Sequence, residues 1–231
     1  MKIALVIERM DTWRGGREKS TAQIAQALAA RGQNVTILCQ SGSWQPPPDT
    51  PPNAINVLPL GRGGLSRSTR LRRFAAAVQR AAADYRYDVV HSMLPIPGVH
   101  VYQLRSGTVP AQREAALRRR GLLSRELARL FEPLNVHRMA MAQLERQVVD
   151  SPRTVLLAVS RMVAGEIEHY YGRTAGVRVI YNAVDVPDVS PDHHHGGCDP
   201  LEGMPLPPKR PERPEARGAV GKMPGDAPRS L

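Results

Sequence analysis

The amino-acid sequence predicts an α/β fold, a parallel β-sheet with helices on both faces. Short, continuously apolar runs recur along residues 1–186, as expected for strands buried on both faces of a sheet. Between these runs lie longer segments whose apolar residues have helical spacing. Strands that alternate with helices in this way are typical of a doubly wound parallel sheet.

The first three predicted elements form one strand–helix–strand unit. KIALVI at residues 2–7 and NVTILCQ at residues 34–40 are the two apolar runs. The alanine-rich helix between them, STAQIAQALAARG, ends at Gly32. A loop with the glycine pair Gly15 and Gly16 connects the first strand to this helix. The order predicts two neighbouring parallel strands joined by a helical crossover.

The same alternation continues to the end of this region. Further strands are predicted at 55–60, 88–92, 154–160 and 177–183, and helices at 66–87, 111–150 (two pieces split at Pro133) and 161–172. We therefore expect a single Rossmann-like domain over residues 1–186.

The composition changes after this domain. From Val186 onward, 46 residues contain ten prolines and six glycines and almost no large apolar side chains. Such a segment cannot bury a core, so residues 187–231 are predicted to be a disordered tail. Two origins stay open: a frameshifted or truncated reading of a GC-rich gene, and a natural tail. The tail's HHHGGC has no folded context, so no metal site is expected.

Positive charge is concentrated in the middle of the chain. The net charge is +11, and residues 61–130 carry 14 arginines, no lysine and four acidic residues. Arginines beside leucine and phenylalanine at helical spacing predict a basic face over residues 62–129 that contacts an anionic membrane or a phosphorylated lipid. A nucleic-acid partner is disfavoured because no nucleic-acid motif is present and aromatic residues are only 4%. A solvated arginine-rich helix is the remaining interpretation.

Cysteine content and hydropathy favour the cytoplasm. Cys39 closes an apolar run and is expected to be a buried free thiol, and Cys198 lies in the tail. Two such cysteines do not make a disulfide framework. The apolar run before Glu8 has five residues, too few for a signal peptide or a membrane span. Any membrane contact is therefore expected at the surface, on the inner face of the cytoplasmic membrane.

Four segments resemble a known family. They are RGGREKSTAQIAQALAARGQNVTIL, YDVVHSMLPIPGVHVYQLRSG, LLAVSRMVAGEIEHYYG and VRVIYNAVDV. In this order and spacing they resemble the N-terminal, acceptor-side domain of the family 4 glycosyltransferases, which have the two-domain GT-B fold. The likeness is greatest to the lipopolysaccharide core glucosyltransferases. Ala183 is a departure, since the family usually has glycine there.

The resemblance implies hexosyl transfer from a nucleotide-sugar donor to a lipid-linked saccharide or lipopolysaccharide, without a metal or other cofactor. The family's second domain, with most of the donor site and an EX7E motif, is not visible in residues 187–231. The chain is therefore expected to be truncated and of little activity alone. Two alternatives stay open: a non-catalytic membrane- or acceptor-binding module, and an arginine-rich nucleic-acid binder.

The glycine pair is the first candidate for substrate binding. Glycines allow a ligand to approach the backbone, and the helix N-terminus that follows offers free N–H groups to an anion. The resemblance implies that Gly15 and Gly16 face the sugar phosphate, whereas a simple turn is the alternative. Arg17 and Lys19 are candidate phosphate contacts, with solvated charge as the alternative.

Asp11 and His91 are the candidate catalytic residues. Asp11 follows the first strand and is a candidate base for the acceptor hydroxyl, or a loop cap. His91 ends a strand at its carboxyl edge, where ligands gather in doubly wound sheets. A structural role is the alternative for His91, and more strongly for His100.

Three further candidates for substrate binding follow later strands. Ser160 and Arg161 begin a predicted helix, with Ser160 as its N-cap. Asn182 and Asp185 lie in the NAVD ending, where the resemblance suggests a cleft or hinge position and turn chemistry is the alternative.

Overall fold

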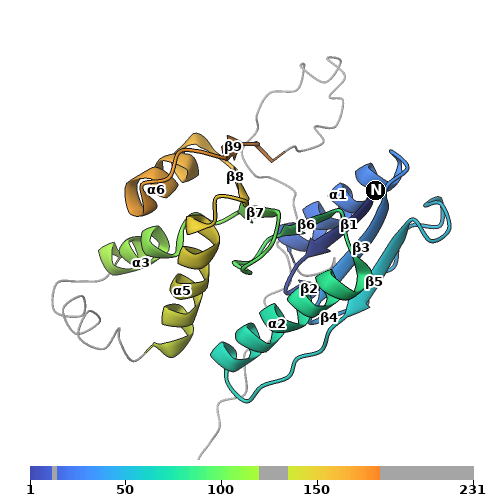
Figure 1. Ribbon diagram of the computed structural model, residues 1–231, viewed down its shortest axis with the longest axis horizontal. Coiled ribbons are helices and arrows are strands. Elements are labelled where there is room, and N and C mark those ends of the chain that lie inside the picture. Colours follow the sequence, from blue (N-terminus) through green and yellow to red (C-terminus); the bar gives the residue numbers. More distant parts are fainter. Residues whose placement is uncertain (12–14, 120–134, 183–231) are drawn as a thin grey trace, which may run out of the picture. The chain divides into compact units, whose positions relative to one another are not determined.

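The computed structural model describes residues 1–11, 15–119 and 135–182 (Figure 1). In this part of the chain, seven parallel strands form one sheet in the order β5-β3-β1-β6-β7-β8-β9. Their bounds are β1 Lys2–Val6, β3 Asn34–Cys39, β5 Ile55–Pro59, β6 Val89–Ser92, β7 Val101–Leu104, β8 Val155–Ala158 and β9 Val177–Val179. A short parallel pair, β2 Arg9–Met10 and β4 Ser41–Gly42, continues beyond the ends of β1 and β3.

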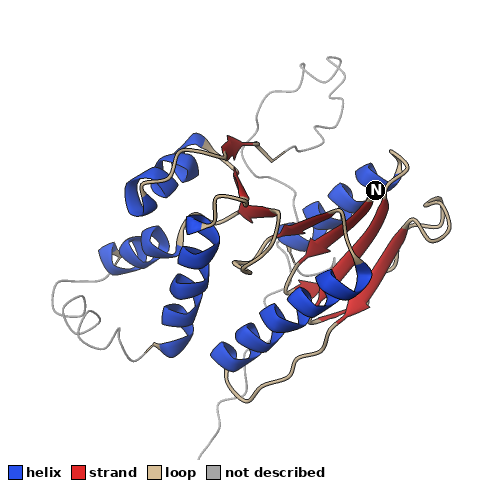
Figure 2. Cartoon of the chain, viewed as in Figure 1, coloured by secondary structure: helices blue, strands red, loops and turns tan. Residues whose placement is uncertain are grey.

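Five described helices connect the strands (Figure 2). They are α1 Gly16–Ala29, α2 Arg67–Tyr85, α3 Val109–Arg118, α5 Val136–Asp150 and α6 Arg161–Tyr171. Side chains at their first residues fix where several of them begin. Ser66 and Thr69 form a reciprocal capping box at α2, and Ser160 accepts the Val163 N–H at α6. Gly172, at φ 67°, ends α6 in the left-handed conformation that glycine adopts readily.

The strand order reverses next to β1. The chain starts in the middle of the sheet at β1 and moves outward through β3 and β5. It then returns to the other side of β1 with β6 and continues outward to β9. The position between β1 and β6 is therefore a topological switch point, and ligands of doubly wound sheets bind outside the carboxyl ends of the strands there.

Both faces of the sheet are buried. Along β1, Ile3 and Leu5 belong to one apolar cluster, whereas Ala4 and Val6 belong to the other. The first cluster is covered by alanines of α1, and the second by apolar side chains of α2, α5 and α6. This two-sided burial explains the continuously apolar strand sequences, and the predicted doubly wound α/β fold is confirmed.

Most predicted elements lie where the sequence placed them, and three short strands were missed: β2, β4 and β7. β2 and β4 have two residues each, and the sequence of β7, VYQL, is short and contains the polar Gln103. The predicted helical region 111–150 contains α3 and α5, while its expected break at Pro133 lies outside the described residues. The predicted disordered tail, 187–231, also lies outside them.

Glu145 is a buried carboxylate that joins four elements. It lies on α5 with only 1% of its surface exposed. Its oxygens accept hydrogen bonds from the hydroxyl groups of Tyr171 (2.6 Å) and Tyr102 (3.3 Å) and from the Val109 N–H (2.8 Å). Burial raises the pKa of this carboxyl group, and the three hydrogen bonds act in the opposite direction. Glu145 thus ties α5 to β7, α3 and α6.

We expect Glu145→Ala to lower the free energy of unfolding by about 3 kcal/mol, because three donors in the protein interior lose their acceptor. Chemical denaturation followed by circular dichroism measures this change. Glu168→Ala is the matched control, since Glu168 is exposed on α6. Equal stabilities of the two variants would contradict this role of Glu145.

Candidate functional site

A cleft lies at the switch point of the sheet. Its volume is about 380 Å³, and it is lined by Ile7, Glu8, Arg9, Gly15, Gly16, Arg17, Glu18, Met93 and Leu94. These residues come from the segment after β1, the first turn of α1 and the segment after β6. We call it the switch-point cleft. The geometry of a parallel sheet therefore brings the predicted glycine pair and Arg17 to the carboxyl edge of β1 and β6.

In the described part of the chain, no side chain caps the N-terminus of α1. Gly15 is the N-cap residue and has no side chain of its own to accept the first free N–H groups of the helix. A Cβ atom at Gly16 would meet no atom within 4 Å, so the space next to this residue is open. An uncapped helix N-terminus beside open space suits an anionic ligand.

Arg105 contacts the first turn of α1 and was not identified as a site residue from the sequence. It follows β7, and its guanidinium donates to the Arg17 carbonyl (2.7 Å) and to Gln103 (3.4 Å). Its remaining terminal nitrogen is buried without a partner among the described residues. The pKa of Arg105 is lowered to about 10, mainly by burial and also by the charge of Arg17, while Glu18 acts in the opposite direction. Arg105 therefore stays charged at neutral pH and adds positive charge behind the cleft.

His91 lies on β6 next to Arg105. The imidazole is largely buried, and its Nε2 atom has no hydrogen-bond partner in the described part of the chain. The pKa of His91 is lowered to about 4, mainly by burial and also by the charge of Arg105, while Gln103 acts in the opposite direction. His91 is therefore neutral at pH 7. A neutral imidazole of this pKa is suited to hydrogen bonding with a hydroxyl group rather than to storing a proton.

Asp11 holds a neighbouring loop. One carboxylate oxygen accepts hydrogen bonds from the Ser43 N–H (3.2 Å) and the Ser43 hydroxyl (3.1 Å). This contact joins the segment after β2 to the segment after β4. It matches the loop-capping alternative, and the catalytic role of Asp11 stays a prediction.

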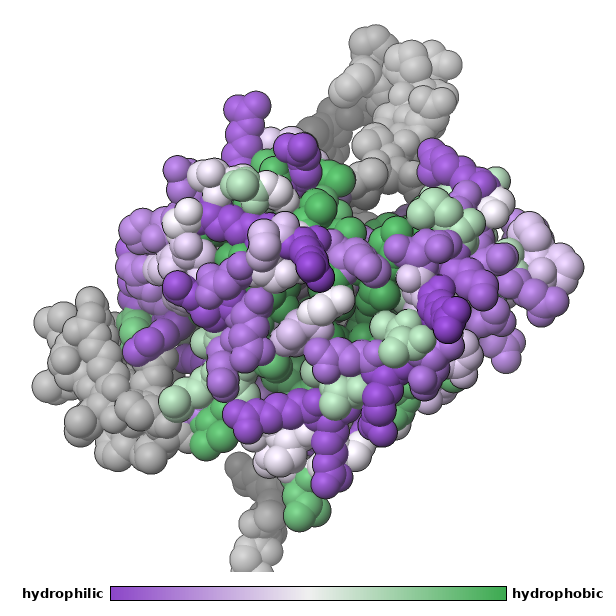
Figure 3. All heavy atoms as spheres, viewed as in Figure 1, coloured by the Kyte–Doolittle hydropathy of each residue, from purple (hydrophilic) through white to green (hydrophobic). Residues whose placement is uncertain are grey.

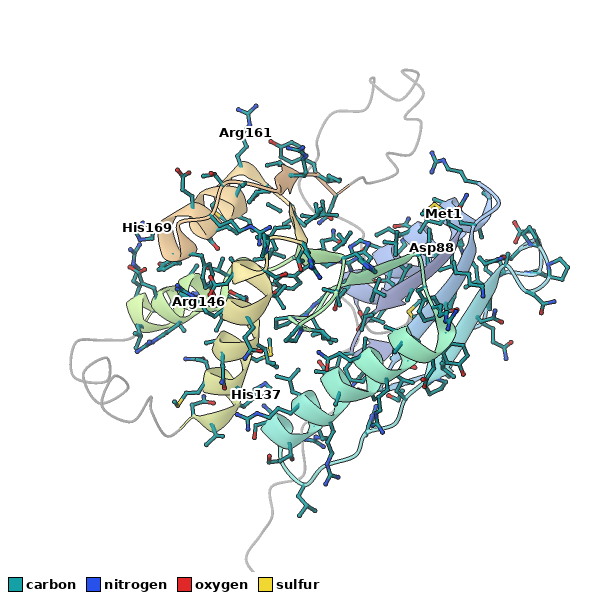
Figure 4. The ribbon with its side chains drawn as sticks, viewed as in Figure 1. Met1, Asp88, His137, Arg146, Arg161 and His169 are labelled. Carbon is teal, nitrogen blue, oxygen red and sulfur yellow. The ribbon has the colours of Figure 1, made fainter. Side chains whose placement is uncertain are left out.

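The other predicted binding residues lie away from this cleft. Lys19 is exposed on α1 and does not line it. Ser160 caps α6, and Arg161 is exposed on the first turn of the same helix (Figure 4). Asn182 is exposed after β9, whereas Asp185 lies outside the described residues. Their binding roles stay predictions.

Two other side chains have structural roles. The Nδ1 atom of His100 accepts the Val90 N–H at 2.9 Å, which joins the segment before β7 to β6. Cys39 is a buried free thiol, as predicted, and burial raises its pKa to about 11, with the charge of Asp11 acting in the same direction. Cys39 is therefore a packed side chain rather than a nucleophile.

A second cleft, of about 330 Å³, adjoins the first. Its lining residues are Glu8, Arg9, Arg17, Gln40, Arg62, Arg67, Arg70, Leu71, Leu94, His137 and Met141, and we call it the arginine cleft. Four of these residues also line the switch-point cleft: Glu8, Arg9, Arg17 and Leu94. The two clefts are therefore continuous. The arginine cleft is strongly basic, whereas the switch-point cleft has two arginines and two glutamates in its lining.

The arginines of the predicted basic face at 62–129 do not form one surface: some line a cleft, one points inward and another lies on an exposed helix. Arg62, Arg67 and Arg70 line the arginine cleft, whereas Arg105 is turned inward. Arg118 pairs with Glu114 at 2.6 Å on exposed α3. Figure 3 shows polar side chains over much of the face that it presents. Binding of this region to a membrane stays a prediction.

A larger cavity, of about 410 Å³, lies at the opposite edge of the sheet, next to the residues that precede β8 and β9. Arg173 lines it, and its guanidinium donates to the backbone carbonyls of Val149, Ser151 and Thr154. This arginine is occupied in holding the loops together. The switch-point edge is therefore the better candidate site, although its clefts are smaller.

Within the described residues, no group of three or more histidine, cysteine, aspartate or glutamate side chains is placed to hold a metal ion. The described helices include none long and apolar enough to cross a membrane.

Comparison with known proteins identifies the family. The profile of Glycosyltransferase Family 4 matches residues 14–187. The chain belongs to glycosyltransferase family 4. The predicted resemblance is thereby confirmed. The match includes the glycine pair, the end of β6 and β9, whereas β1 and the cleft residues Ile7, Glu8 and Arg9 precede it. A search of curated protein sequences gives no match.

Two solved structures have a similar fold. The crystal structure of WaaG, a glycosyltransferase involved in lipopolysaccharide biosynthesis, matches with a TM-score of 0.61 and 20% identity, over 77% of this chain and 44% of WaaG. Sucrose-phosphate synthase from Thermosynechococcus elongatus matches with a TM-score of 0.52 and 16% identity, over 80% of this chain and 48% of the synthase. The family 4 chain thus spans about half the length of both proteins, and the likeness supports the GT-B half-fold.

We expect His91 to titrate with a pKa of about 4, and Arg105→Gln to raise that pKa because a neighbouring positive charge is removed. NMR of the imidazole resonances measures both values, and Arg161→Gln is the control with a distant exposed arginine. Between pH 6.5 and about 4 the imidazole is protonated in the unfolded chain but not in the folded chain. His91 should therefore lower the free energy of unfolding as the pH falls through this range. A His91 pKa near 6.5 in both the unchanged chain and Arg105→Gln would contradict the burial of this imidazole.

Proposed function

We propose that the chain is the acceptor-side half of a glycosyltransferase that transfers a sugar from a nucleotide-sugar donor to a lipid-linked saccharide or lipopolysaccharide. The observation that carries this proposal is the uncapped N-terminus of α1, which opens into the switch-point cleft beside Gly15 and Gly16. Membership of glycosyltransferase family 4 supports the reaction class. The likeness to WaaG suggests the class of acceptor, because WaaG is involved in lipopolysaccharide biosynthesis.

The proposed reaction is a substitution at the anomeric carbon of the donor sugar. The acceptor hydroxyl oxygen forms a bond to this carbon, the bond to the diphosphate oxygen breaks, and the nucleoside diphosphate leaves with the electron pair. The hydroxyl proton is lost during the transfer. By the family resemblance, the anomeric configuration is retained.

The lining of the switch-point cleft, together with Arg105 and His91, which do not line it, suits two parts of this reaction. The N–H groups at the start of α1, with Arg17 and Arg105 nearby, favour the negative charge that develops on the leaving diphosphate. The neutral imidazole of His91 is suited to orient a sugar hydroxyl by hydrogen bonding. Both contributions act through positioning and electrostatics rather than through covalent chemistry.

Transfer also requires the donor side of the cleft. The chain spans 44% of WaaG and 48% of the synthase, and the resemblance assigns the donor site to a second domain. We therefore propose that these residues bind the acceptor and that transfer also needs a donor domain. A non-catalytic acceptor-binding module is the second candidate.

The proposed location is the cytoplasm, with peripheral contact to the inner face of the membrane. Exposed arginines of α2, among them Arg72 and Arg73, support this proposal through attraction to anionic lipids.

We expect Gly16→Val to preserve the fold and to weaken ligand binding. A Cβ atom at Gly16 meets nothing within 4 Å, and valine has a higher helix propensity than glycine, so no loss of stability is expected. The two γ-methyl groups, however, would stand between an anion and the free N–H groups of α1. Thermal unfolding and titration with a nucleotide-sugar measure the two effects.

Gly165→Val is the matched control, because Gly165 is an exposed helical glycine on α6 that also meets no atom within 4 Å. Equal binding by both variants would assign the glycine pair to a ligand-free turn. The transfer itself is tested by mass spectrometry of a lipopolysaccharide-core acceptor incubated with nucleotide-sugars, the chain and a separately expressed family 4 donor domain. Absence of transfer with every donor, despite acceptor binding, would leave the binding module as the function.

A further inference from the structure

The arginine cleft collects positive side chains from separate parts of the fold. Arg9 comes from β2, Arg17 from α1, Arg62 from the segment after β5, and Arg67 and Arg70 from the first turns of α2. Residues this far apart in sequence reach one cleft only through the tertiary fold. The concentration of charge is therefore a property of the site and not of a single basic segment.

The charge of the cleft is largely uncompensated. Five guanidinium groups line it, and Glu8 is the only carboxylate among its lining residues in the described part of the chain. Arg62 donates its Nε–H to the Ser41 hydroxyl at 3.0 Å. For Arg9, Arg67 and Arg70, the described residues provide no hydrogen bond or ion pair to the guanidinium group. Like charges held this close repel one another, so an anionic occupant would stabilise the cleft.

The beginning of α2 adds to the positive potential. The capping box of Ser66 and Thr69 fixes the first turn, with the Thr69 N–H bound to the Ser66 hydroxyl at 3.1 Å. This turn contains no acidic residue, whereas Arg67 is its first residue and Arg70 lies one turn later on the same side. Cations at a helix N-terminus oppose the helix dipole. A bound anion would offset both charges.

His137 supplies an unsatisfied polar atom at the same place. It lies in the first turn of α5, beside the first turns of α2 (Figure 4). Its Nδ1 atom is buried and has no hydrogen-bond partner in the described part of the chain. The apolar side chains of Leu71, Leu94 and Met141 complete the lining. Polar groups that converge on an apolar wall are typical of a small-ligand site.

We propose that the arginine cleft binds a part of the acceptor that carries two or more phosphate groups. Guanidinium groups bind phosphate oxygens through paired, charge-assisted hydrogen bonds, and several of them around one cleft select for several phosphates. This inference rests on the proposed glycosyltransferase function and deepens it: the acceptor sugar to be modified, or its neighbour, is a phosphorylated sugar. The adjoining switch-point cleft then receives the hydroxyl group that reacts.

Clustered phosphate oxygens could also come from the diphosphate of the donor. The two sources differ in chemistry, since the acceptor offers phosphate monoesters on a sugar ring and the donor offers a nucleoside diphosphate. The test therefore uses both probes. Glucose 1,6-bisphosphate represents the acceptor and uridine diphosphate represents the donor.

The experiment is isothermal titration calorimetry of the full 231-residue chain. We expect glucose 1,6-bisphosphate to bind, glucose not to bind, and the affinity to fall with increasing salt. The double variant Arg67→Gln/Arg70→Gln should weaken the binding of glucose 1,6-bisphosphate by about 10-fold or more, because charge-assisted hydrogen bonds are lost. The matched control Arg31→Gln/Arg80→Gln removes two exposed arginines, one after α1 and one on α2, that do not line the cleft. It should bind like the unchanged chain.

Circular dichroism confirms that both double variants are folded before they are compared. Lack of glucose 1,6-bisphosphate binding, or equal weakening by the two double variants, would overturn the proposal. Loss of uridine diphosphate binding alone in Arg67→Gln/Arg70→Gln would assign the cleft to the donor and also overturn it. Bisphosphate binding without sugar transfer in the presence of a donor domain would contradict the proposed enzyme but not the phosphate site. Transfer to an unphosphorylated acceptor would contradict the phosphate site but not the proposed enzyme.

Discussion

The parallel hydrogen bonding of β1 with both of its neighbours is the constraint on which the rest of the structure depends. Five residue pairs join β1 to β3 and four join it to β6. Because these strands run in one direction, their carboxyl ends lie along one edge of the sheet. Because the chain leaves β1 toward β3 and later returns to β6, no crossover helix fills the space beyond that edge. The cleft is thus a consequence of strand order before any side chain is considered.

Side chains then give this space its chemistry. The loop after β7 is held from several directions: Arg105 donates to α1, and Glu166 accepts the Thr108 N–H at 2.9 Å. Glu145 accepts the next N–H, that of Val109. These contacts hold Arg105 and His91 in the protein interior, where burial keeps the imidazole neutral. The guanidinium of Arg105 stays charged because its pKa, although lowered, is still about 10. The result is a positively charged site with an uncharged hydrogen-bonding group.

Much of the fold could be predicted from the sequence, because two-sided burial leaves continuously apolar runs such as the one in β1. β7 was missed because four residues that include Gln103 give no such pattern. The glycine pair was found because a strand–glycine–helix order has a physical meaning by itself. Arg105 and His137 could not be found in this way. Their importance depends on burial without a full set of partners, which only the packing of distant elements creates.

The central claim is that substrates bind at the switch-point edge of the sheet and not at the opposite edge. Hydrogen–deuterium exchange of the full chain, with and without a phosphorylated lipopolysaccharide-core oligosaccharide, tests it most directly. The account predicts slower exchange in residues 15–18 and 93–94, which line the two continuous clefts. Slower exchange confined to residues 149–153 and 172–176, around the cavity at the opposite edge, would contradict it.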